Sequence, residues 1–272
     1  MATGDGLALD GDAGRADEAN RRIYQEIALR SCGSVDDVDG LVLVTGCHPS
    51  PIIANVAFRR IDRPPVRLPP PVLLDGIVHH FESVGHGASL ITSERRDQDV
   101  DAAAEAAGWV PAIDLPVKFT DARSMPDPAA RDPTSRGWTR SETLDRSSTS
   151  WFPASPRATT SGGCSELSSR RPRASLVRVS APFSRPRGGT FTGAGALYRF
   201  DDVAVVGFIT VIESHRNRGL GTGITAALTN AAFEDGATLA ALQASPMGYP
   251  VYRRMGFKTA GRDQIWIPPA SG

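Results

Sequence analysis

Lysine is almost absent from this chain of 272 residues: only Lys118 and Lys258 stand among its thirty basic side chains. Thirty acidic residues balance the basic ones, which argues against a nucleic acid or an anionic membrane as partner of the whole chain. Cysteine is scarce too. Cys32, Cys47 and Cys164 have no metal-ligand spacing, so we expect no metal site and no disulfide framework, and a reducing, cytoplasmic setting.

Long apolar runs are also missing. No stretch approaches the roughly 18 apolar residues that cross a bilayer, and the first dozen residues combine no cationic patch with an apolar segment. We therefore expect neither a membrane span nor export. With 40% hydrophobic residues, a chain of this length can bury roughly three quarters of its unfolded surface, in one large or two modest domains.

Composition divides the chain into three segments. The first, residues 16–120, alternates helical and strand patterns and is predicted to be an α/β domain with a mixed sheet and flanking helices. Helices are expected near residues 17–29, 72–82 and 97–107, and strands near 41–44, 51–58, 88–92 and 113–119.

The second segment, residues 121–193, is rich in Ser, Arg and Pro. Between Asp121 and Thr190 it has 14 Ser and 12 Arg but only 6 acidic residues, and too few large apolar side chains to form a core alone. It is interpreted as a flexible insert of low order. A basic interaction tail and the product of a shifted reading frame are the alternatives.

The third segment, residues 194–272, is again α/β. A strand rich in β-branched residues is expected at 203–211, a helix at 219–233, and further strands at 239–243 and 265–267. Ser245 and the proline after it predict the start of a short helix that ends near Met255.

Two stretches share an order of elements. Residues 88–119 and 238–267 each read strand, helix, Gly-aromatic and strand, with Gly108-Trp109 in the first and Gly256-Phe257 in the second. Either the chain is a degenerate internal duplication or a common motif has recurred.

The sharpest chemical signal is a glycine-rich turn between the strand at 203–211 and the following helix. Glycines let successive backbone N–H groups converge, the helix dipole adds positive potential, and arginine forks suit phosphate oxygens. The predicted anion cradle consists of Arg216, Arg218, Gly219, Leu220, Gly221, Thr222 and Gly223. It has neither the lysine and hydroxyl of a P-loop nor the third glycine of a dinucleotide fingerprint.

Arg216-x-x-Gly219-x-Gly221 resembles the pyrophosphate-binding motif of the GCN5-related N-acetyltransferases (GNAT). Downstream, residues 252–257, Tyr-Arg-Arg-Met-Gly-Phe, are similar to that family's Tyr-x-Lys/Arg-x-Gly-Phe signature. The resemblance covers about residues 195–267. It implies an acyl-CoA N-acyltransferase fold, here as a single or degenerate tandem copy.

The resemblance also implies roles for residues. Acetyl-CoA would be the acyl donor, with its acetyl carbonyl near the backbone of Val211 and its pyrophosphate on the cradle. Tyr252 matches the position that protonates the departing thiolate, a step suited to a phenol that is neutral at pH 7; its alternative role is to pack beside Phe257. Glu213 and His215 are the candidate general bases, without a motif to choose between them.

The function implied is transfer of an acetyl group to a primary amine, on a small molecule or a peptide, without a metal. The alternative is a non-catalytic acyl-CoA-binding or regulatory module, because residues 121–193 stand where the family has elements that wall the acceptor pocket. Either residues 16–120 supply those walls or the pocket is lost. The acceptor and the oligomeric state are left open.

Overall fold

The structure is a computed structural model that describes residues 11–31, 33–52, 54–60, 68–122, 173–179 and 192–270. The chain forms two compact units. The larger unit comprises residues 1–125 and 241–272, and the smaller unit comprises residues 126–240. The two units differ from the three consecutive segments that the composition suggested. The difference arises because the last strands of the chain belong to the same unit as the first strands.

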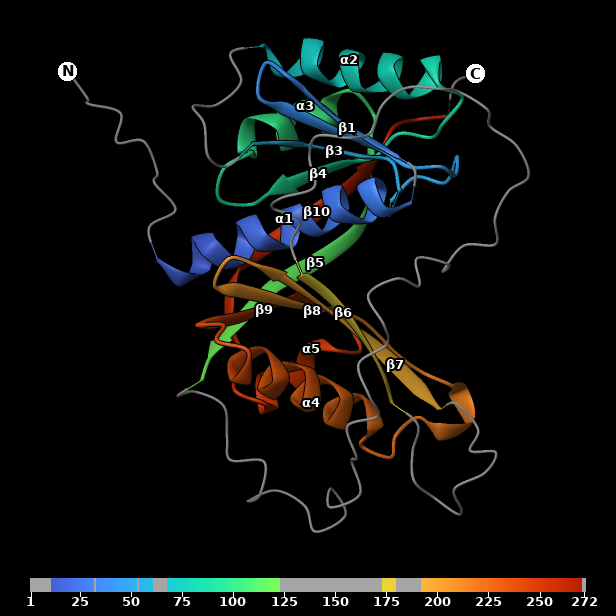
Figure 1. Ribbon diagram of the computed structural model, residues 1–272. Helices are drawn as coiled ribbons and strands as arrows, with labels where there is room; N and C mark the ends of the chain where they lie inside the picture. The colour runs from blue at the N-terminus through green and yellow to red at the C-terminus, as the bar shows by residue number, and fades with distance from the viewer. Residues whose placement is uncertain are drawn as a thin grey trace, which may run out of the picture. The chain divides into compact units, whose positions relative to one another are not determined.

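The described chain contains both helices and strands (Figure 1). The helices are α1 (Asp12–Arg30), α2 (Pro70–Ser83), α3 (Gln98–Ala106), α4 (Leu220–Glu234) and α5 (Tyr249–Arg254). The strands are β1 (Ser34–Val38), β2 (Leu41–Thr45), β3 (Val56–Arg59), β4 (Leu90–Ser93), β5 (Val110–Asp121), β6 (Arg173–Val179), β7 (Gly193–Phe200), β8 (Val203–Val211), β9 (Leu239–Gln243) and β10 (Lys258–Ile267).

The sheet of the larger unit has the strand order β1-β2-β3-β4-β10-β5-β9. Strands β1 to β3 form an antiparallel meander, and β3 runs parallel to β4. Strand β10 is antiparallel to both of its neighbours, β4 and β5. The predicted mixed sheet with flanking helices is confirmed.

Helices cover both faces of this sheet. On one face, α2 and α3 pack against the strands through a cluster that includes Phe81, Trp109 and Trp266. On the other face, α1 contributes Tyr24 and Ala28 to a second cluster. Strand residues alternate between the clusters, as the two-residue period of a strand requires: Leu41 and Leu43 belong to the first, and Val42 and Val44 to the second.

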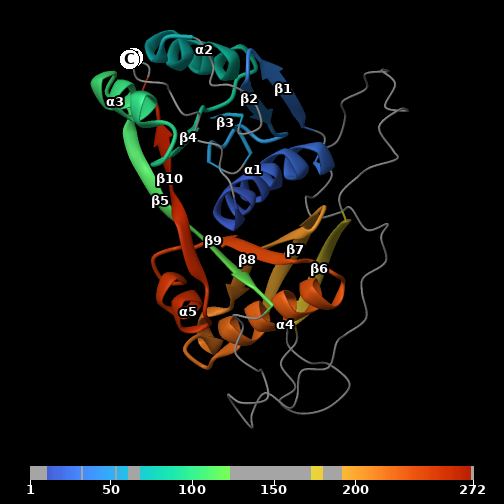
Figure 2. The same cartoon turned by 90° about the vertical axis from the view of Figure 1, so that its left-hand side faces the viewer.

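The two stretches with the same order of elements, residues 88–119 and 238–267, interleave their strands in this sheet. Strand β10 lies between β4 and β5, and β5 lies between β10 and β9 (Figure 2). Helices α3 and α5 also end alike, each on a left-handed glycine, Gly108 and Gly256. The N–H of Trp109 bonds the carbonyl of Ala104 at 2.9 Å, and the N–H of Phe257 bonds that of Tyr252 at 3.0 Å. Helices α2 and α4 end in the same way, at Gly85 and Gly236, so this geometry does not decide between an internal duplication and a recurring motif.

In the smaller unit, β7 pairs with both β6 and β8, and α4 packs against β7 and β8. A Cβ at Gly195 would lie 2.5 Å from Cδ1 of Ile209 and 2.7 Å from Cδ1 of Leu228. A side chain there would therefore displace the ends of these two side chains, of which Leu228 packs α4 against the strands. Strand β6 lies within residues 121–193, and most of that segment is outside the described residues.

Most expected elements are present, with differences at their ends. Strands β8 and β9 match their expected bounds, whereas β1, β6 and β7 were not expected as strands. The predicted start of α5, directly after Ser245, was wrong. The helix begins at Tyr249, because residues 245–248 form a turn. In that turn Ser245 accepts the N–H of Gly248 on its hydroxyl at 3.2 Å and the N–H of Tyr249 on its carbonyl at 2.9 Å.

Candidate functional site

The chain turns sharply between β8 and α4. A single 3₁₀ turn, Glu213–His215, is followed by two residues with left-handed backbone, Asn217 (φ 60°) and Gly219 (φ 77°). Asn and Gly are the residues that adopt this conformation most readily. The turn brings the cradle residues predicted from the sequence, 216 and 218–223, together at the N-terminus of α4.

Backbone donors at this helix end are available to a ligand. The first helical bond runs from the N–H of Gly223 to the carbonyl of Gly219, at 2.9 Å. The N–H groups of Leu220, Gly221 and Thr222 come before it, and Gly219 has no side chain to cap them. A Cβ built on Gly221 would have no atom within 4 Å. There is therefore room beside the helix start at position 221.

Two guanidiniums add full positive charge. Arg216 donates from Nε to the carbonyl of Val211, at 3.2 Å, which ties this side chain to the end of β8. Both Arg216 and Arg218 are exposed, and within the described part of the chain neither forms an ion pair. Their charge is thus not neutralised by a neighbouring carboxylate, and the site favours a polyanion.

Strand β8 carries a bulge that the sequence analysis missed. Gly207 pairs with Ala196 and Thr210 with Ala194, so β8 has one residue more than β7 over this interval. Phe208, in the bulge, has a positive φ of 54°. Its ring meets that of Tyr198 edge to face, with centroids 6.3 Å apart. Glycine within a β-branched run was the available signal, because it often marks a bulge.

Tyr252 lies on α5 in the larger unit, and its ring is half-buried. The ring stands 6.0 Å from that of Phe257. It also covers Gly248, where a Cβ would come within 2.7 Å of Cε2 of Tyr252. The packing contact expected as the alternative role of Tyr252 is therefore present, and it fixes where the phenol ring can lie.

Of the candidate bases, Glu213 is exposed, and its carbonyl accepts the N–H of Arg216 at 3.1 Å. His215 shares a hydrogen bond of 3.0 Å between its Nδ1 and the hydroxyl of Ser214. Both residues lie in the smaller unit with Val211 and the cradle, whereas Tyr252 belongs to the larger unit.

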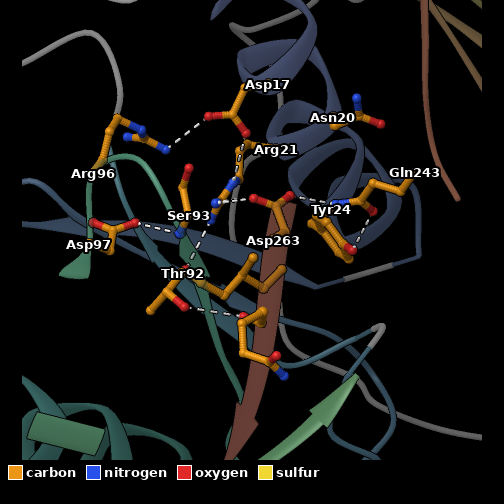
Figure 3. Close-up of polar contacts among 12 residues, drawn as sticks. Asp17, Asn20, Arg21, Tyr24, Thr92, Ser93, Arg96, Asp97, Gln243 and Asp263 are labelled. Carbon is orange, nitrogen blue, oxygen red and sulfur yellow. Dashed lines mark hydrogen bonds and ion pairs between the residues drawn. The ribbon is translucent and has the colours of Figure 1, made fainter. Parts of the chain in front are cut away.

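A buried polar cluster in the larger unit was also missed (Figure 3). Arg21 donates to Asp263 Oδ1 at 2.8 Å and to the carbonyl of Ile91 at 2.9 Å. The other oxygen of Asp263 accepts Nε2 of Gln243 at 2.8 Å, and Gln243 accepts the hydroxyl of Tyr24 at 2.9 Å. The cluster links α1 to β4, β9 and β10. The spacing of Asp17, Asn20, Arg21 and Tyr24, which places them on one helix face, was the signal.

Burial has a large effect on the titratable groups of this cluster. It raises the pKa of Asp263 to about 6, although Arg21 opposes the shift. Burial alone would lower the pKa of Arg21, but the carboxylates of Asp263 and Asp17 raise it above its ordinary value. Because both oxygens of Asp263 already accept hydrogen bonds, the cluster is built to hold α1 on the sheet.

No three His, Cys, Asp or Glu side chains of the described ranges gather around a point where a metal ion could sit. None of the helices drawn from those ranges combines the length and the apolar character needed to cross a bilayer. Cys32 and Cys164 lie outside the described residues, and Cys47 is an exposed thiol.

The sequence between β3 and α2 lacks the glycine-rich pattern that precedes α4. Between β3 and α2 the chain reads Arg-Ile-Asp-Arg-Pro-Pro-Val-Arg-Leu-Pro, without a glycine and with three prolines that carry no N–H. Ala104 occupies, in the end of α3, the place that Tyr252 has in the end of α5. The glycine-rich start of α4 and the phenol of Tyr252 therefore have no counterparts at these two places in the sequence of the first half.

The chain is similar to known proteins in part of its sequence and in its fold. The acetyltransferase (GNAT) family matches residues 150–257, and no curated protein matches the chain. A GCN5-related N-acetyltransferase from Kribbella flavida has a similar structure, with a TM-score of 0.64 and 19% identity over 96% of this chain and 97% of that one.

Two more solved structures are similar over nearly their whole length. A tandem GNAT protein from the clavulanic acid biosynthesis pathway has a TM-score of 0.53 and 15% identity, over 100% of this chain and 98% of that one. A GCN5-related N-acetyltransferase from Sphaerobacter thermophilus has a TM-score of 0.51 and 12% identity, over 98% and 95%. The chain thus has the fold of the GCN5-related N-acetyltransferases, and its C-terminal region is a region of the GNAT acetyltransferase family.

Proposed function

We propose that this protein is an N-acetyltransferase that moves the acetyl group of acetyl-CoA to a primary amine by direct attack. The observation that carries the proposal is the start of α4. There, three N–H groups that precede the first helical bond and two arginines without acidic partners in the described chain lie inside the region that matches the family. A diphosphate ester is the ligand that such a site suits best.

Each residue then has a role in one transfer. The backbone from Arg218 to Gly223, together with Arg216, binds the pyrophosphate of the donor. Backbone groups near Val211 hold the acetyl carbonyl, and Glu213 accepts the proton of the attacking amine. Tyr252 donates its phenolic proton to the thiolate that leaves, which separates the products as an amide and a free thiol.

Gly221 offers a direct test of the cradle. Because its Cβ position is open and its φ is not left-handed, Gly221→Asp adds a carboxylate without a clash. We expect calorimetry to show affinity for coenzyme A at least about tenfold lower, since the new charge opposes the phosphates. Gly221→Asn, a neutral side chain of the same shape, is the matched control and should bind several-fold more tightly than the Asp variant. Equal binding by both variants would remove the cradle from the proposal.

Tyr252→Phe tests the chemistry separately from binding. Loss of the phenolic hydroxyl should lower kcat about 100-fold in assays of thiol release across a panel of amines, while the dissociation constant of coenzyme A stays the same. A wild-type chain that binds acetyl-CoA but releases no thiol with any amine would instead support the non-catalytic binding module.

A further inference from the structure

Lys118 is a buried cation in the larger unit. It lies on β5 with a relative exposure of 1%, and no carboxylate of the described residues forms an ion pair with it. Its Nζ donates to the hydroxyl of Thr259 at 3.1 Å and to the carbonyl of Phe257 at 3.4 Å, and it stands 4.3 Å from the centre of the Tyr249 ring. Burial lowers the pKa of this ammonium, and the Tyr249 phenol opposes that shift.

The choice of lysine at this position is informative. The chain uses arginine almost everywhere, with Lys118 and Lys258 as the exceptions among thirty basic residues. A guanidinium is a planar fork with five donors, whereas an ammonium is a compact charge with three. One hydroxyl, one carbonyl and one ring face suit the three directions of an ammonium. The contacts of this side chain therefore match an ammonium better than a guanidinium.

These contacts lie at the start and just after the end of α5, the short helix that carries Tyr252. Helix α5 has six residues, no side-chain cap at its N-terminus and no buried residue of its own. Lys118 contacts its first residue, Tyr249, and also the carbonyl of Phe257, just beyond its C-terminus. The N–H of Phe257 in turn bonds the carbonyl of Tyr252 at 3.0 Å. The ammonium thus braces both ends of the turn on which Tyr252 lies.

We propose that Lys118 is a positioning residue for Tyr252. Lys118 holds α5 in place by its contacts with Tyr249, Phe257 and Thr259. The role assigned to Tyr252 rests on the proposed function, whereas the placement of its ring by Lys118 does not. The sequence shows that Lys118 is one of two lysines but not what it contacts, because 139 residues separate it from Phe257.

Lys118→Met tests the role in catalysis, since Met keeps much of the buried volume and removes the charge. We expect kcat to fall about tenfold while the dissociation constant of coenzyme A changes less than about twofold. In a Tyr252→Phe background the same change should cost nothing further, because its effect is carried by the phenol. Lys258→Met, at a lysine with 58% side-chain exposure, is the matched control and should leave kcat unaltered. Additive losses in the double variant would overturn the proposal.

A readout without turnover tests the placement itself. The chain has four tyrosines, so their ring resonances can be followed in protein with ¹³C-labelled tyrosine, with Tyr252 assigned from Tyr252→Phe. Lys118→Met should shift or broaden the Tyr252 resonance, and Lys258→Met should not. Thr259→Val, which removes one acceptor from Lys118 at an exposed position, should shift it in the same direction and serves if Lys118→Met does not fold.

The two proposals fail in different ways. If Tyr252→Phe turns over like the wild type, the acid role of Tyr252 is wrong, and the resonance still decides whether Lys118 places the ring. An unchanged Tyr252 resonance in Lys118→Met and Thr259→Val would overturn the proposal for Lys118, whatever the activity.

Discussion

Gly248 and Tyr252 show how one missing side chain places another. The ring of Tyr252 occupies the space where a Cβ of residue 248 would stand, 2.7 Å from its Cε2. One glycine therefore allows the phenol to lie over the start of α5, with Phe257 beside it. The Tyr-x-Arg-x-Gly-Phe pattern pointed to Tyr252, but the contact with Gly248 depends on how the turn before α5 folds.

Asp263 makes a prediction about pH. Because burial raises its pKa from 3.8 to about 6 in the folded protein, the folded state keeps this proton to a higher pH than the unfolded chain does. The contribution of Asp263 to the free energy of unfolding therefore falls as the pH rises from about 4 to about 6. Asn mimics the protonated acid, so the stability of Asp263→Asn relative to wild type should rise by up to about 3 kcal/mol over this interval.

Urea unfolding of both proteins between pH 4 and 8 measures this difference. The relative stability should level off above about pH 7, where Asp263 is ionised in both states. A difference that is flat across the range, or that moves in favour of the wild type, would contradict the assigned shift.

At the scale of elements, helix ends were predictable because glycine marks them. Helices α2, α3, α4 and α5 are each followed by a left-handed glycine, at 85, 108, 236 and 256. In each case the next N–H bonds a carbonyl five residues back, which is the Schellman geometry. The starts of these helices were harder to predict, because none of them has a side-chain cap. The predicted start of α5 was therefore misplaced.

A glycine inside α2 and a glycine just after it should respond in opposite ways to replacement by alanine. Gly76 lies inside α2 at an exposed site, and a Cβ there would meet no atom within 4 Å, so Gly76→Ala should stabilise by about 0.5–1 kcal/mol. Gly85, just after α2, has equal space but a φ of 71°. Gly85→Ala should destabilise by about 1 kcal/mol. Thermal unfolding of the two variants compares them, and a loss of stability in Gly76→Ala would be inconsistent with this account.

At the scale of the whole molecule, the position of β10 decides how the strands of the larger unit are held together. This strand is the last of the chain, yet it pairs with β4 and β5 in the interior of the sheet. Its side chains Ile265 and Trp266 enter the clusters on opposite faces. A chain that lacks β10 would expose two strand edges and open both clusters.

Deletion of residues 258–272 should therefore abolish the cooperative unfolding transition of the larger unit and the hydrogen-exchange protection of β4 and β5. Deletion of residues 268–272, which follow β10, is the control and should preserve both. If the shorter chain keeps protected amides in β4 and β5, the interleaved arrangement does not hold this unit together.

Local patterns of residues by themselves determined much of this protein. Periodicity indicated most helices and strands, and the Gly-rich turn with its two arginines indicated the cradle at the start of α4, because both signals arise from residues adjacent in the chain. The tertiary structure decided the rest: the interleaving of β5 and β10, the ionic cluster around Arg21 and Asp263, and the contact of Lys118 with α5. These features join residues far apart in sequence, and such contacts form only where packing and burial bring separate elements together.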